Sequence, residues 1–155
     1  MKPDFMRAAI RLSLQAVRAG TGGPFGAVVV KGGRIIGRGR NQVTSRNDPT
    51  AHAEIVAIRE ACNRLKAFRL DGCELYTSCE PCPMCLAAIY WARLGRVYYG
   101  NTRADAAEIA FDDEMLYREV ARPLGRRKLL MKQLLRKEAL VAFTEWAETP
   151  DKIQY

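Results

Sequence analysis

Apolar and polar positions along this chain follow two spacings, one helical and one extended. In residues 1–20 the apolar side chains recur at helical spacing, which predicts an amphipathic helix that ends at Gly20. The apolar side of this helix carries Met6, Ile10, Leu14 and Val17. Residues 22–41 contain two apolar, β-branched runs around a Lys-Gly-Gly turn and predict a hairpin.

The remaining pattern predicts strands alternating with helices. Thr50 can cap a helix that runs to about Lys66 and carries an apolar stripe at Ile55, Val56, Ile58, Ala61, Cys62 and Leu65. Further helices are predicted at residues 80–93, 104–111 and 137–148, and strands at residues 73–78 and 96–100. Residues 126–135 fit either a strand or a helix. This order predicts one three-layer α/β domain, with helices covering a central sheet.

Composition narrows the class of protein. A chain of 155 residues with 48% hydrophobic and 27% charged residues is typical of one globular domain. No stretch has the roughly 20 apolar residues that a membrane span needs, and the N-terminus lacks the pattern of a signal peptide. We therefore expect a cytoplasmic protein without membrane contact. Its five cysteines are then expected to be thiols or metal ligands rather than disulfides.

The formal charge of +8 is concentrated in one segment. Residues 118–137 contain Arg118, Arg122, Arg126, Arg127, Lys128, Lys132, Arg136 and Lys137, opposed by Glu119 alone. Such a cluster could contact nucleic acid phosphates, but the segment has few aromatic side chains for base stacking. We favour a solvated arm and keep nucleic acid contact as the alternative.

One histidine and two cysteines have the spacing of a metal site. Cys82 and Cys85 lie three residues apart at a predicted helix start, so both can face one metal ion. His52 is the only histidine and can be the third ligand, although a single histidine is more often a surface or satisfied core residue. Three protein ligands leave the fourth position of a Zn²⁺ site for water, which is the catalytic arrangement. Glu54 follows His52 by two residues and could move the proton of that water.

Cys79 extends the cysteine spacing to Cys-x2-Cys-x2-Cys, which is also part of one iron–sulfur pattern. A cluster would need a fourth cysteine, and both Cys62 and Cys73 lie within apolar patterns. We therefore expect Cys79 to be a buried thiol at a strand end.

His-Ala-Glu at residues 52–54 and Pro-Cys-x-x-Cys at residues 81–85 resemble the signature of the zinc-dependent nucleobase deaminases. Over its whole length the chain resembles the bacterial guanine deaminases of the cytidine deaminase superfamily, through the segments GGPFGAVVVK, NDPTAHAE, LYTSCEPCPMC, AAIYWAR and FDDEMLY. The resemblance implies a three-layer α/β/α cytidine deaminase-like fold with a central mixed sheet. It also implies that His52, Cys82 and Cys85 bind zinc and that Glu54 is the proton shuttle.

The same resemblance implies a set of substrate-binding residues. Phe25 would stack on the purine, and Asn41 would hydrogen-bond to the base. Asp113 would accept hydrogen bonds from the guanine edge, and Trp91 and Tyr155 would help to close the pocket. From the residues alone, Phe25 could equally be a core aromatic beside a turn, and Asp113 a helix cap or a solvated turn residue.

The resemblance further implies a homodimer in which the C-terminal segment, about residues 113–155 of the single 1–155 domain, is exchanged between subunits. The expected reaction is hydrolytic deamination of guanine to xanthine and ammonia, as part of purine catabolism or salvage. The alternatives are a tRNA adenosine-to-inosine deaminase and a deaminase of another small aminated heterocycle, such as an aminotriazine or a pterin. A further alternative is a basic nucleic-acid-binding module with a structural zinc.

Overall fold

The computed structural model describes residues 2–154. They divide into two compact units, with the boundary between Asp113 and Glu114. The boundary coincides with the expected start of the exchanged C-terminal segment, and the exchange itself stays a prediction.

The first unit is built on a four-stranded sheet in the order β2-β1-β3-β4. Its strands are β1 (Gly26–Lys31), β2 (Arg34–Arg40), β3 (Cys73–Cys79) and β4 (Arg96–Asn101). Strand β1 is antiparallel to both β2 and β3, whereas β3 and β4 are parallel. The predicted hairpin and mixed sheet are therefore confirmed.

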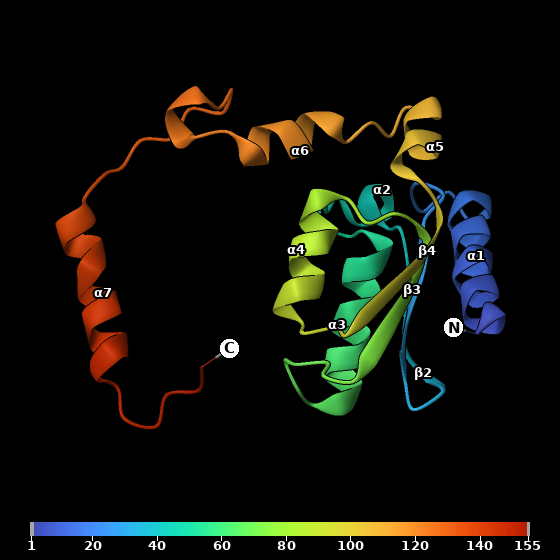
Figure 1. Cartoon of the computed structure of the whole chain (residues 1–155), viewed down its shortest axis with the longest axis horizontal. Coiled ribbons are helices and arrows are strands. Elements are labelled where there is room, and N and C mark those ends of the chain that lie inside the picture. The colour runs from blue at the N-terminus through green and yellow to red at the C-terminus, as the bar shows by residue number, and fades with distance from the viewer. Residues whose placement is uncertain (1, 155) are drawn as a thin grey trace. The chain divides into compact units, whose positions relative to one another are not determined.

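Helices cover both faces of this sheet. Figure 1 shows α1 (Pro3–Arg18) on one face and α3 (Ala53–Leu65) and α4 (Pro83–Trp91) on the other. Two apolar clusters fill the layers: one includes Val29, Ile58 and Leu75 on the α3 side, and the other includes Val28 and Tyr76 on the α1 side. The short helices α2 (Val43–Arg46) and α5 (Arg103–Glu108) complete the unit. The three-layer α/β/α prediction is confirmed.

Helix α1 forms as predicted but packs through a different face. Its buried residues are Ala9, Ser13 and Ala16, while Ile10, Leu14 and Val17 are exposed. In the middle of the helix small side chains face the sheet because the helix lies directly on Gly26, where a β-carbon would come within 2.3 Å of the Ala9 carbonyl oxygen. Near the start of the helix, Met6 of the predicted stripe does pack against the cluster of Val28 and Tyr76. Close backbone approach decided the packing face, and the spacing of the large apolar side chains did not.

Helix α3 lies equally close to strand β2, and glycine makes this possible. A β-carbon on Gly39 would lie 1.9 Å from the Ala53 carbonyl oxygen, and one on Gly37 would lie 2.3 Å from the Ala57 carbonyl oxygen. Neither distance is compatible with any side chain. The two glycines therefore determine where the first turn of α3 sits over the sheet.

The second unit contains α6 (Glu114–Ala121), the 3-10 turn η1 (Leu124–Arg126) and α7 (Arg136–Glu148). The predicted final helix is confirmed, but residues 127–135 form neither a strand nor a helix. None of the described residues of this unit, 114–154, is buried, although many are large and apolar, among them Leu130, Leu134 and Phe143. Taken by itself, the unit leaves these apolar side chains uncovered.

Some cations of the basic segment, residues 118–137, form hydrogen bonds and ion pairs within the second unit. The Arg127 guanidinium donates to the carbonyl oxygens of Val120, at 3.2 Å, and Arg122, at 3.1 Å. Glu119 pairs with Arg122 and accepts the Lys128 backbone N–H at 2.7 Å. These contacts close the turn after α6 and leave the other cations of the segment at the surface.

Across residues 2–154, the structure has no helix with the length and apolar content that crossing a bilayer would require.

Replacing Gly39 by Ala should lower the free energy of unfolding, because the added methyl group would overlap the Ala53 carbonyl oxygen. Overpacking of this kind costs about 1–3 kcal/mol, which urea denaturation can measure. Gly95→Ala is the control, since a β-carbon there would meet only the Cys73 carbonyl oxygen at 3.6 Å. Equal losses in the two variants would contradict the close-approach explanation.

Candidate active site

The first turn of α3 carries His52 and Glu54. The helix begins at Ala53, and His52 is its N-cap residue with an extended backbone, so the cap predicted at Thr50 is two residues too early. Thr50 instead donates its hydroxyl to Asp48 at 2.7 Å, within the turn before the helix. This turn places the His52 side chain beside the helix N-terminus.

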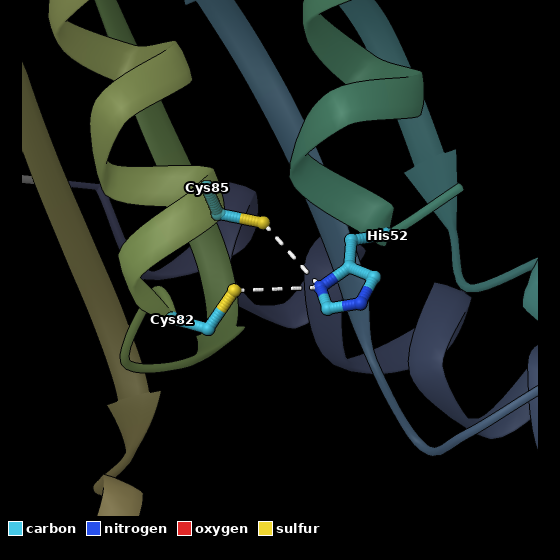
Figure 2. Close-up of side chains that lie close together, drawn as sticks. All are labelled: His52, Cys82 and Cys85. Atoms are coloured by element: carbon cyan, nitrogen blue, oxygen red, sulfur yellow. Dashed lines mark hydrogen bonds between the residues drawn. The ribbon is translucent and has the colours of Figure 1, made fainter. Parts of the chain in front are cut away.

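Helix α4 supplies the two cysteines in the same way. Cys82 is its N-cap residue, Pro83 occupies the first helical position, and Cys85 follows in the first turn. Proline is favoured there because the first helical N–H has no partner within the helix. Figure 2 shows both sulfur atoms pointing toward the His52 ring, across the space between α3 and α4.

The three side chains have the spacing of a metal site. The Nδ1 atom of His52 lies 3.6 Å from the Cys82 sulfur and 3.5 Å from the Cys85 sulfur. All three candidate ligand atoms lie within 4.8 Å of one another. A tetrahedral zinc ion with ordinary bond lengths would hold nitrogen and sulfur ligands about 3.5 Å apart. The donor set and its spacing therefore fit zinc.

Hydrogen bonds among these groups favour the thiolate form of Cys82 over that of Cys85. A hydrogen bond from the Cys85 thiol and the neighbouring His52 together lower the pKa of Cys82 to about 4, against the effect of burial. The same contact with Cys82, together with burial, raises the pKa of Cys85. A bound cation would reverse this second effect, since a coordinating thiol is deprotonated outright.

Glu54 lies beside this group and is enclosed by the protein. Only 5% of its surface is exposed, and burial raises the pKa of its carboxyl group. Its Oε1 atom accepts a hydrogen bond from the Thr77 hydroxyl at 2.9 Å, while Oε2 lies 3.5 Å from the Cys85 sulfur. Glu54 is thus held next to the metal-binding atoms without belonging to the group of candidate ligands.

Cys79 is the last residue of β3 and stays outside the candidate metal group. Its thiol donates to the Thr102 carbonyl oxygen at 3.5 Å, and burial raises its pKa to about 11. The prediction of a buried thiol at a strand end is confirmed.

Asn41 follows β2 and is buried in a fixed orientation. Its Oδ1 atom accepts the backbone N–H groups of Gly23, at 3.3 Å, and Val43, at 3.2 Å. Backbone N–H groups can only donate, so the oxygen must occupy this position. The Nδ2 amide is then the end of the side chain left for other contacts, and it can only donate.

Phe25 precedes β1 and packs edge-on against Phe111, with ring centroids 5.0 Å apart. Its backbone carbonyl accepts the Asn41 N–H at 3.0 Å, which keeps Phe25 and Asn41 adjacent. Phe111 was missed in the sequence, although it begins the FDDEMLY segment that carries Asp113. A β-carbon on Gly23 would meet both rings, at 2.8 Å for Phe111 and 2.9 Å for Phe25.

The other expected pocket residues differ in position. Asp113 is partly buried, and both burial and the nearby Cys82 thiolate raise the pKa of its carboxyl group, which indicates that it lies near the metal group. Trp91 is the last residue of α4, roughly 13 Å along the helix from Cys82 at its start, and is 63% exposed. Tyr155 lies outside the described residues. The roles of all three stay predictions.

Comparison with known proteins gives one family and several relatives. The family model for the cytidine and deoxycytidylate deaminase zinc-binding region matches residues 1–101. The guanine deaminase of Bacillus subtilis (strain 168) is 52% identical over 151 residues, which cover 97% of each chain. A tRNA-specific adenosine deaminase of Aquifex aeolicus is 45% identical over 98 residues, which cover 63% of this chain and 64% of that protein.

Two solved structures that resemble this chain are also guanine deaminases. The X-ray structure of guanine deaminase from Bacillus subtilis matches with a TM-score of 0.96 and 50% identity, covering 100% of this chain and 99% of that one. The structure of guanine deaminase from Nitrosomonas europaea matches with a TM-score of 0.67 and 34% identity, covering 71% of this chain and 64% of that one.

Cys85→Ser should abolish tight metal binding, whereas Cys79→Ala should retain one zinc per chain. Loss of an outer-shell partner alone costs a metal site about 10- to 100-fold in affinity, so loss of a ligand should cost more. Metal content after dialysis against a graded chelator series measures the difference. If Cys79→Ala lost the metal as readily as Cys85→Ser, the three-ligand site would be wrong.

Proposed function

The chain belongs to the cytidine and deoxycytidylate deaminase family, and from this membership we propose that it is a guanine deaminase. The main support is its similarity to the Bacillus subtilis guanine deaminase, which extends over 97% of each chain. The reaction is hydrolytic: guanine and water give xanthine and ammonia. The enzyme is accordingly a hydrolase acting on carbon–nitrogen bonds, with a role in purine catabolism or salvage.

We propose Zn²⁺ as the cofactor, held by His52, Cys82 and Cys85. When bound, zinc supplies a Lewis acid that makes water nucleophilic at neutral pH. Three ligands suit this role because a structural site is normally closed by four. The helix N-termini that carry the cysteines and the histidine favour thiolate ligands through their partial positive charge.

Glu54 is the proposed proton shuttle. Oε2 is the oxygen that faces the ligand group, and it accepts the proton of the attacking water. Addition at C2 of guanine opens the C2–N3 double bond and makes C2 tetrahedral, and Oε2 passes that first proton to N3. The second proton of the water, now on the C2 hydroxyl, then passes through Oε2 to the amino nitrogen. The C2–N bond breaks, ammonia leaves, and the C2 carbonyl of xanthine forms. Burial suits this cycle because it raises the pKa of the carboxyl group toward the working pH. A group whose pKa lies near the working pH can both accept and donate a proton.

Base recognition is assigned to Asn41, Asp113 and Phe25. The fixed Nδ2 group of Asn41 can donate to an acceptor of the purine, while the Asp113 carboxylate accepts from guanine N1–H. Adenine has an unprotonated N1 in that position, which is a hydrogen-bond acceptor like the carboxylate itself. The two acceptors would repel each other, so adenine would bind poorly. Phe25 supplies an aromatic face beside Asn41.

The tRNA adenosine deaminases remain the second candidate, because relatives of that kind match about two thirds of this chain and the net charge is +8. Three cations of the basic segment, Arg118, Arg122 and Arg127, are engaged in local contacts, which lowers its capacity for phosphate binding. None of the five cysteines forms a disulfide within the described residues, which fits the cytoplasmic location that the sequence predicts.

We further propose a homodimer that exchanges the segment from residue 113 onward. The support is the second unit itself, where exposed apolar side chains such as Leu130 and Phe143 have no cover among the described residues 114–154. A second copy of the chain would provide that cover, and the exchanged end would close the pocket of the partner.

The purified protein should release ammonia from guanine and leave guanosine, adenine and cytosine unchanged. Glu54→Gln should keep the fold and the metal but lose turnover by about 10²- to 10⁴-fold, because proton transfer is removed. An ammonia assay with parallel metal analysis measures both. Inosine formation in tRNA, with guanine untouched, would instead support the second candidate.

Mixing two inactive variants tests the exchange of segments. Glu54→Gln lacks the proton shuttle, and Tyr155→Ala lacks the expected closing residue. In an exchanged dimer, every dimer that contains both chains should regain one intact pocket, while its other pocket carries both substitutions. Unfolding and refolding the variants together should therefore restore guanine deamination, whereas refolding them separately should not. If the mixture gained no activity while forming dimers, each chain would close its own pocket.

A further inference from the structure

The Glu54 carboxylate has two oxygens in different surroundings. Oε1 accepts from the Thr77 hydroxyl at 2.9 Å, and Oε2 lies 3.5 Å from the Cys85 sulfur. We propose that Thr77 is a positioning residue: its hydroxyl holds Oε1 and so keeps Oε2 as the oxygen that faces the reacting groups. This inference rests on the proposed deaminase function and adds a residue to it.

Thr77 is well placed for this role because the strand beneath it is anchored on both sides. It lies in β3, where it pairs with Ala27 of the antiparallel strand β1 and with Tyr99 of the parallel strand β4. Its side chain points into the layer that contains α3 and is completely buried. A hydroxyl group on such a strand is a rigid donor, so the oxygen that it binds is also held still.

The neighbours of Glu54 explain why a donor is needed. The side chain is enclosed, but rotation about its last bond could still turn the carboxylate plane away from the metal ligands. The Cys85 sulfur is a weak partner for Oε2, while the hydroxyl is a strong partner for Oε1. The hydrogen bond from Thr77 therefore fixes the plane of the carboxylate, so that the oxygen not bound to Thr77 is directed toward the metal ligands.

Complete burial also limits how Thr77 can act. With none of its surface exposed, it cannot touch a substrate in the open part of the site. Its effect must pass through Glu54, so removing the hydroxyl should change the rate of the chemical step and leave substrate binding nearly unaltered.

Thr77→Val removes the hydroxyl and keeps the shape of the side chain. A hydrogen bond to a charged group corresponds to about 10- to 100-fold, so kcat for guanine should fall by that factor while KM changes by less than ~3-fold. Thr77→Ser restores the hydroxyl without the methyl group and should recover most of kcat. Zinc content should be unchanged in both variants.

Ser78→Ala is the matched control. Its hydroxyl is also buried, lies at the next position of β3, and accepts the Gly26 backbone N–H at 3.0 Å instead of contacting Glu54. Ser78→Ala should lower stability without changing kcat. If Ser78→Ala and Thr77→Val reduced kcat equally, the effect would belong to the strand in general and the proposal would be wrong.

Crystal structures supply a readout that does not depend on activity. In Thr77→Val the Glu54 carboxylate should adopt a rotated or mixed orientation, whereas in Thr77→Ser Oε1 should stay within hydrogen-bond distance of the hydroxyl. An unmoved carboxylate in Thr77→Val, or a loss of kcat in Thr77→Ser as large as in Thr77→Val, would overturn the proposal. Thr77→Ala serves as the second hydroxyl-free variant if Thr77→Val does not fold.

The test separates this inference from the proposed function. If the unmodified protein fails to release ammonia from guanine, the proposed function fails, and the carboxylate orientation in the crystal structures still decides the role of Thr77. If the unmodified protein is active and Thr77→Val has the same kcat, only the positioning role fails.

Discussion

The direct contact between the backbones of α3 and β2 is the constraint on which the candidate site depends. Gly37 and Gly39 leave no atoms between the strand and the helix, so α3 rests on the sheet through backbone contact alone. A helix seated this way cannot shift along the strand without overlap. The residues of its first turn, His52 and Glu54, consequently have one position relative to the end of β3, where Thr77 and the loop to α4 lie.

This placement brings two helix N-termini to one place, and their partial positive charges explain the chemistry collected there. Thiolates at Cys82 and Cys85 and a carboxylate at Glu54 are all anions, and each would be costly to bury alone. The helix ends offset part of that cost, and the proposed zinc ion would offset the rest. The site is therefore one electrostatic unit, in which the acid, the sulfur atoms and the helix ends depend on one another.

The sequence was informative where the chemistry needs rare residues at short spacing. His52, Cys82 and Cys85 could be selected because one histidine and a Cys-x2-Cys pair at helix starts have few other uses. Packing was less predictable: the apolar stripe at Ile10 and Leu14 indicated the wrong face of α1, since contact at Gly26 required small residues. Thr77 and Phe111 gave no signal, because their partners are distant in sequence, and the Asn41 orientation depends on backbone groups that no pattern shows.

The absence of buried side chains among residues 114–154 has a consequence for how the protein folds and assembles. Such a segment gains almost nothing from folding by itself, so its helices become stable only when another surface covers them. If a second chain provides that surface, the final folding step is a collision between two molecules. Active enzyme would then form at a rate that rises as the square of protein concentration. At low concentration the chains would stay partly folded, with residues 114–154 uncovered, for longer.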